Sequence, residues 1–184
     1  MTSKPNAIVY LRRNDLIVGG KHITPGKLKF TSDLIENLEI QDPDKFVSTC
    51  ADFFASHDMK GKKVLIVLDQ SVVFDKNLNL DEMSKAEADD ISDGFISAMP
   101  FSAGQRVSVK YHKDNNIFLY ATNSDLFQAI NEALDVSGIR KLVSVTPAIA
   151  YKIDYSGKSS DIIDQFLTDK KIRNKINFST VNPI

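Results

Sequence analysis

The chain has 184 residues, 42% of them hydrophobic and 26% charged, a single cysteine and a formal net charge of -1. This length suits one domain or two small subdomains that share a core, and the near-neutral balance with scattered lysines excludes the basic surface that nucleic acid requires. One cysteine excludes a disulfide framework, and no apolar run approaches the roughly 20 residues of a membrane-spanning helix.

The first forty residues have a β pattern. Ala7–Leu11 and Leu16–Gly19 predict two short strands that form a hairpin, because the apolar alternation breaks between them at turn-forming residues. Lys27–Phe30 adds a third strand after a Pro-Gly pair, and Leu34–Ile40 is expected to be a further extended segment.

A helix follows at Asp42 and Pro43, since the aspartate can cap free amides and proline is tolerated at the first helical position. Gly61 is expected to end this helix, and Val64–Leu68 is an unbroken apolar run of the kind that forms a central strand covered on both faces. The buried face of the helix is predicted to comprise Phe46, Cys50, Phe53 and Phe54.

The pattern restarts after Asp69 and Gln70. Val72–Leu80 predicts a strand, and Ser84, with a glutamate three residues later, forms a capping box that opens a helix. Pro100 stops this helix because it cannot continue the backbone hydrogen bonds. Arg106–Lys113 and Asn116–Thr122 then predict a second hairpin.

The last third contains a helix capped by Asn123 or Ser124 and closed at Gly138, followed by a strand at Leu142–Val145 that ends at a proline. One more amphipathic helix is predicted from Ile162, Ile163, Phe166 and Leu167. The basic cluster of Lys170, Lys171, Arg173 and Lys175 favours a solvated helix end, with contact to a membrane surface as the alternative.

These elements, in this order, resemble the PilM family's actin-like domain over residues 34–150. The likeness rests on Leu34–Pro43 leading into the first helix, on Ser71–Phe74 opening an inserted subdomain, on Met99–Phe101 after its helix, and on Val143–Ala150. FtsA and GspL proteins share this architecture.

The resemblance implies a mixed α/β fold: an actin-like, ribonuclease H-like half-domain with a small inserted strand-helix-strand-strand subdomain of SHS2 type. Residues 1–70 and 148–184 would form the actin-like core, and residues 71–147 the inserted subdomain.

Actin-fold nucleotide sites need a first phosphate loop with glycine and an early aspartate, so that backbone amides approach the phosphates and Mg²⁺ is held. Leu11–Asn14 stands at that position and has neither, and residues 151–184 are too few to encode the second half of such a site. Gly19, Gly20 and Lys21 lack the spacing of a phosphate-binding loop. We therefore expect no enzyme activity, no cofactor and no metal.

The resemblance further implies a partner: the short amino-terminal peptide of a PilN-like inner-membrane pilus assembly protein, held in a groove between the core and the inserted subdomain. A proline-enforced helix stop tends to be exposed, and clustered exposed apolar groups mark interaction sites. The residues predicted to border this groove are Phe74, Leu78, Met99, Pro100 and Phe101.

The resulting hypothesis is a non-catalytic cytoplasmic scaffold at the inner face of the plasma membrane, which links a motor ATPase to pilus or secretion components. One alternative is an FtsA-like ATPase whose second half is absent from this chain, and another is the cytoplasmic domain of a GspL-like membrane protein. The tail, with Ile176, Asn177, Phe178, Asn182 and Pro183, is similar to the Ile-Asn-Leu-Leu-Pro peptide of the PilN partner, as though adaptor and partner were fused.

Overall fold

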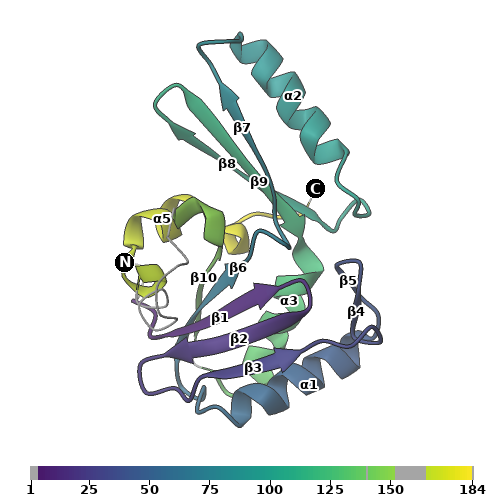
Figure 1. The fold of residues 1–184 in the computed structure, drawn as a ribbon, viewed down its shortest axis with the longest axis vertical. Coiled ribbons are helices and arrows are strands. Elements are labelled where there is room, and N and C mark those ends of the chain that lie inside the picture. The colour runs from purple at the N-terminus through teal and green to yellow at the C-terminus, as the bar shows by residue number, and fades with distance from the viewer. Residues whose placement is uncertain (1–3, 140, 152–164, 184) are drawn as a thin grey trace.

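The computed structural model describes residues 4–139, 141–151 and 165–183. Two sheets dominate these residues, a larger one with helices on both of its faces and a smaller one that projects from it (Figure 1). The chain enters the smaller sheet after the larger sheet has begun and returns to the larger sheet afterwards.

The larger sheet contains five strands in the order β10-β6-β1-β2-β3. β6 (Lys63–Leu68) pairs in parallel with both β1 (Ala7–Arg12) and β10 (Lys141–Pro147), whereas β2 (Asp15–Gly20) and β3 (Gly26–Lys29) continue from β1 as antiparallel strands. The continuous apolar sequence of β6 is explained by its central place, since its side chains are covered on both faces.

Two helices cover one face of the larger sheet. Asp42 caps α1 (Pro43–Ala55) by accepting a hydrogen bond from the Lys45 amide at 3.0 Å, and α1 packs beside α3 (Ser124–Val136). Cys50 is fully buried in α1, and this burial raises the pKa of its thiol to about 12, which agrees with its prediction as a small core residue. On the opposite face, Phe166 packs in one cluster with Ile8 of β1, with Leu65 and Val67 of β6, and with Ala148.

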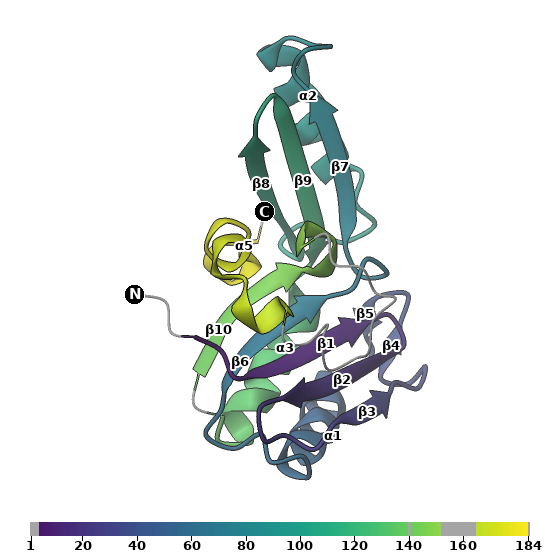
Figure 2. The same cartoon turned by 60° about the vertical axis from the view of Figure 1, so that its left-hand side comes forward.

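The smaller sheet has three antiparallel strands in the order β7-β9-β8. It comprises β7 (Phe74–Asn79), β8 (Arg106–Lys113) and β9 (Asn116–Asn123), and α2 (Lys85–Ser97) covers one face of it (Figure 2). The predicted capping box at the start of α2 is present, because the Ser84 amide donates to Glu87 at 2.8 Å. The observed element order is therefore strand, helix, strand, strand.

The segment predicted to be extended from Leu34 to Ile40 is instead a miniature hairpin of β4 (Ile35–Glu36) and β5 (Glu39–Ile40). The chain reverses because Asn37 and Leu38 adopt positive φ angles of 51° and 66°. The alternation of apolar side chains did not reveal this turn.

After β10 the chain forms a 3₁₀ turn, η1 (Ala148–Tyr151), and the described part resumes with helical residues 165–168. It ends in α5 (Lys170–Lys175) and a second 3₁₀ turn, η2 (Phe178–Thr180). The helix predicted from Ile162 and Ile163 lies partly outside the described residues. Among the described helices, none is both long and apolar enough to cross a bilayer.

The extent of the inserted unit differs from the range of residues 71–147 proposed from the sequence. Only β7, α2, β8 and β9 belong to the smaller sheet, whereas α3 packs on α1 and β10 pairs with β6 in the larger sheet. The chain enters the smaller sheet just after Val72, and there the Thr122 hydroxyl of β9 donates a hydrogen bond to the Val72 carbonyl at 2.7 Å. Sequence periodicity gives the type of an element but not the sheet to which it pairs, and this difference explains the misplaced boundary.

Candidate functional site

A groove of about 480 Å³ lies between the smaller sheet and the C-terminal segment. One wall is the face of the smaller sheet that α2 leaves open, and the other is formed by η1 and the start of α5 (Figure 2). The side chains lining this groove are Asp75, Asn77, Tyr111, Lys113, Phe118, Tyr120, Ile149, Ala150, Tyr151, Asp169, Lys171 and Ile172.

The sheet wall exists because β9 alternates its side chains between two apolar environments. Ile117 and Leu119 point to α2 and are buried there with Leu78, whereas the residues between and beside them point to the other face. In that direction Tyr111 of β8 stands directly opposite Phe118 of β9, with ring centroids 6.2 Å apart. The open face is thus aromatic where a solvent-facing surface would ordinarily be polar.

The C-terminal wall is fixed by its own hydrogen bonds. Asp169 caps α5 by accepting from the Ile172 amide at 3.0 Å, and the buried guanidinium of Arg173 donates to the carbonyls of Phe166 and Leu167, each at 3.0 Å. Lys175 of α5 contacts the sheet wall, because its Nζ lies 5.4 Å from the centroid of the Tyr111 ring. The groove therefore has two ordered sides.

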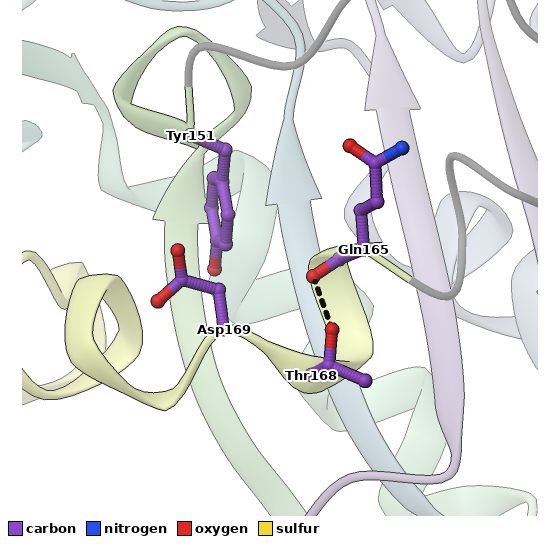
Figure 3. A pocket seen from close by; sticks show the side chains of 4 residues that line it. All are labelled: Tyr151, Gln165, Thr168 and Asp169. Atoms are coloured by element: carbon purple, nitrogen blue, oxygen red, sulfur yellow. Dashed lines mark hydrogen bonds between the residues drawn. The ribbon is translucent and has the colours of Figure 1, made fainter.

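Tyr151 and Asp169 line both this groove and a second pocket of about 340 Å³. Figure 3 shows the Asp169 carboxylate beside the Tyr151 ring, with Gln165 and Thr168 across the pocket. The Tyr151 hydroxyl lies 2.9 Å from Oγ1 of Thr146, and burial raises the pKa of Tyr151 well above its ordinary value. It remains a neutral phenol at physiological pH.

The five residues predicted from the sequence do not line either pocket. Leu78 is buried under α2, whereas Met99 and Phe101 are only 7% and 3% exposed. The half-buried ring of Phe74 packs edge-on against Phe101 with centroids 5.7 Å apart, and Pro100 alone is exposed. The expectation that Met99 and Phe101 lie exposed at the helix stop was therefore wrong.

The physical reason lies in the turn after α2. Proline ends the helix as predicted, but the chain folds back toward the larger sheet, and Arg106 Nε donates to the Phe101 carbonyl at 2.7 Å. The apolar side chains on either side of Pro100 consequently enter the core between the sheets. A helix stop sets the direction of the backbone, and side chains beside it can still point inward.

The residues that sequence reasoning missed are the aromatic ones on the open face. Tyr111, Phe118 and Tyr120 alternate with residues that face α2, and the predicted hairpin around Asp114 and Asn115 fixes their relative register. That register and the excess of aromatic side chains on one face were available in the sequence. The missing information was that α2 covers only the other face.

The tail compared with the PilN peptide is part of the core. Ile176 and Phe178 are fully buried, and the Phe178 ring stacks on Phe127 of α3 with centroids 6.4 Å apart. Oδ1 of Asn177 accepts a hydrogen bond from the Val145 amide of β10 at 2.9 Å. Since η2 contacts both β10 and β8, this segment fills the space between the two sheets.

The position of the first phosphate loop is a tight turn between β1 and β2. Arg12 and Asp15 pair across it through an Nε–Oδ1 contact of 2.6 Å, and the Arg13 amide donates to Ser71 Oγ at 3.1 Å. The Arg13 guanidinium contacts Asn37 Oδ1 at 3.4 Å. Within the described residues, His, Cys, Asp and Glu side chains form no cluster suited to a metal ion.

Neither a protein-family model nor a curated protein matches the chain. Among solved structures, it is similar to a PilM-PilN type IV pilus biogenesis complex, with a TM-score of 0.51 and 10% identity over 78% of this chain and 47% of that one. It is also similar to the cytoplasmic domain of EpsL, an inner-membrane component of the type II secretion system of Vibrio cholerae, with a TM-score of 0.50 and 10% identity over 79% and 58% of the two chains.

A Bacteroides thetaiotaomicron protein with an actin-like ATPase fold gives a TM-score of 0.45 at 9% identity, over 84% of this chain and 56% of that one. The chain therefore spans about half the length of the structures that it matches. The likeness is one of fold, and it confirms that the mixed α/β fold inferred from the sequence is similar to that of the PilM-PilN and EpsL structures.

Proposed function

We propose that this chain is a non-catalytic adaptor module that binds an extended peptide in the groove between the smaller sheet and the C-terminal segment. The observation that carries the proposal is the open aromatic face of the smaller sheet, in which Tyr111, Phe118 and Tyr120 stand opposite Ile149 and Ile172. A cleft with apolar walls and a few polar groups is the usual form of a binding site.

The geometry suits a peptide better than a compact small molecule. β7 and β8 are both edge strands of the sheet wall, so each has backbone groups that a further strand could pair with. Aromatic side chains on the adjoining face would supply the pockets that select the peptide's side chains. An extended segment satisfies both requirements at once.

For the partner, we propose an inner-membrane protein of the PilN type and a scaffold role at the cytoplasmic face of that membrane, between a motor ATPase and pilus or secretion components. Support comes from the shared fold with the PilM-PilN complex and with the cytoplasmic domain of EpsL. The proposal concerns this half-length module and the surface that it carries.

The test is a fluorescence anisotropy titration with a labelled peptide that contains Ile-Asn-Leu-Leu-Pro. The wild type should bind it, and Phe118→Ser should weaken binding by about 30-fold, the equivalent of a hot-spot loss of about 2 kcal/mol. Val136→Ser is the control, because Val136 is 67% exposed on α3 and lies outside the groove. Equal affinity for the wild type and Phe118→Ser would exclude this site.

The rival hypothesis is a nucleotide-dependent ATPase. The absence of catalysis is supported by the β1–β2 turn, where the Arg13 amide already donates to Ser71 and the Arg12 guanidinium pairs with Asp15. We expect millimolar ATP with Mg²⁺ to leave the melting temperature unchanged, because only a ligand that binds the native state stabilises it. A rise of several degrees would favour the ATPase.

A further inference from the structure

Tyr120 is a buried tyrosine whose hydroxyl has no hydrogen-bond partner among the residues that the structure describes. The residue is 6% exposed, and it lines the groove from the central strand of the sheet wall. Two other tyrosine hydroxyls do have partners: that of Tyr10 donates to Asp69 Oδ2 at 2.6 Å, and that of Tyr151 lies 2.9 Å from Thr146 Oγ1. Buried polar groups are almost always satisfied, so a hydroxyl that lines a groove and has no described protein partner is available to a ligand that enters the groove.

The hydroxyl is held in its protonated form. Burial, followed by the nearby charge of Asp75 and by Tyr111, raises the pKa of Tyr120 to about 12. At neutral pH the group is therefore available as a donor to a carbonyl oxygen within the groove.

A carboxylate stands beside this hydroxyl. Asp75 of β7 is the direct register partner of Tyr120, is exposed, and forms no ion pair with a described residue. Asp169 lines the opposite wall next to Tyr151 (Figure 3), with one of its oxygens committed to the α5 amide.

Two lysines, Lys113 and Lys171, also line the groove. Lys113 is paired with Asn116, four residues from Tyr120 along β9, and therefore lies toward the outer end of the sheet. Lys171 lies on α5 and forms no ion pair with a described residue. Asp75 therefore places a carboxylate with no described ion-pair partner beside Tyr120 on the sheet wall, away from Lys113 along the sheet, where it can accept from a cation.

We propose that Tyr120 and Asp75 determine the specificity of the groove for a peptide with a basic side chain: the Tyr120 hydroxyl donates to a backbone carbonyl of the peptide, and Asp75 accepts from an arginine or lysine beside it. This inference rests on the peptide-binding role proposed above. One arginine or lysine of a peptide has both a backbone carbonyl and a basic side chain. Tyr120 and Asp75 together could therefore bind the backbone and the side chain of the same residue.

The experiment compares two peptides, Arg-Ile-Asn-Leu-Leu-Pro and Gln-Ile-Asn-Leu-Leu-Pro, on three proteins. The wild type should prefer the arginine peptide by about tenfold, as a charge-assisted hydrogen bond would give, and Asp75→Asn should abolish that preference. Tyr120→Phe should weaken both peptides by about fivefold, because it removes one neutral hydrogen bond and keeps the ring.

Thermal melts give a second readout that does not depend on a peptide. Tyr120→Phe should leave the melting temperature unchanged or raise it, because it removes an unsatisfied buried hydroxyl. Tyr10→Phe is the matched control and should lower it, because the hydroxyl that it removes is bonded to Asp69. An equal loss in both variants would overturn the proposal, since Tyr120 would then have a structural partner.

The peptide results separate the two proposals. Equal binding of both peptides to the wild type and to Tyr120→Phe would overturn the specificity roles and leave the adaptor role standing. Failure of both peptides to bind the wild type would overturn both proposals.

Discussion

Phe101 is a residue whose surroundings decide between two opposite roles. It lies in the main core cluster where the two sheets meet, with its ring edge-on to Phe74 and its carbonyl bonded to Arg106. A partner could not reach such a side chain without opening the junction. We therefore assign Phe101 to the stability of the molecule and not to its binding surface.

Phe101→Ala should lower the free energy of unfolding by about 3 to 5 kcal/mol, since it leaves a cavity among well-packed side chains. Urea denaturation followed by circular dichroism measures this change. Pro100→Ala serves as the control, because Pro100 is exposed, and it should cost far less. A Phe101→Ala protein as stable as the wild type would return this residue to the binding surface.

Among the elements, the C-terminal segment joins the two sheets most directly. α5 lines the groove, and the following turn, η2, inserts between β10 and β8. Among the described hydrogen bonds between this segment and the larger sheet, the Val145 amide donates to Asn177 Oδ1 and the Ser144 hydroxyl donates to the Arg173 carbonyl. The full burial of Ile176 and Phe178 adds a hydrophobic contribution to its attachment.

Phe178→Ala should destabilise the protein by about 3 kcal/mol or more and should speed amide exchange in α5 before it affects the central strands. Hydrogen exchange with mass spectrometry resolves the two regions. Asn182→Ala, an exposed change in the same tail, should alter neither. If α5 in Phe178→Ala exchanged only together with β1 and β6, the segment would open only with the rest of the molecule, which would contradict this prediction.

For the molecule as a whole, the local elements could be predicted and their pairing could not. Asp42, Ser84 and Asn123 each cap a helix where the sequence indicated one, because caps and periodicity act within a few residues. The assignment of α3 and β10 to the larger sheet depends on contacts with α1 and β6, which are distant in sequence. A single sequence contains no direct signal for such contacts.

The candidate site divides in the same way. The aromatic face of Tyr111, Phe118 and Tyr120 follows from strand alternation and hairpin register, both of which are local. That this face remains open, and that Ile149 and Ile172 stand across from it, depends on where α2 and α5 pack. The site therefore depends on tertiary packing, which strand alternation and hairpin register do not determine.

Chemical-shift mapping with the unlabelled Ile-Asn-Leu-Leu-Pro peptide on ¹⁵N-labelled protein tests the adaptor role most directly. We expect the largest amide shifts at Tyr111, at Phe118–Tyr120, and at residues 149–151 and 169–172, because these segments line the groove. Shifts confined to the β1–β2 turn near Arg13, or to the outer surface of α2, would contradict the account.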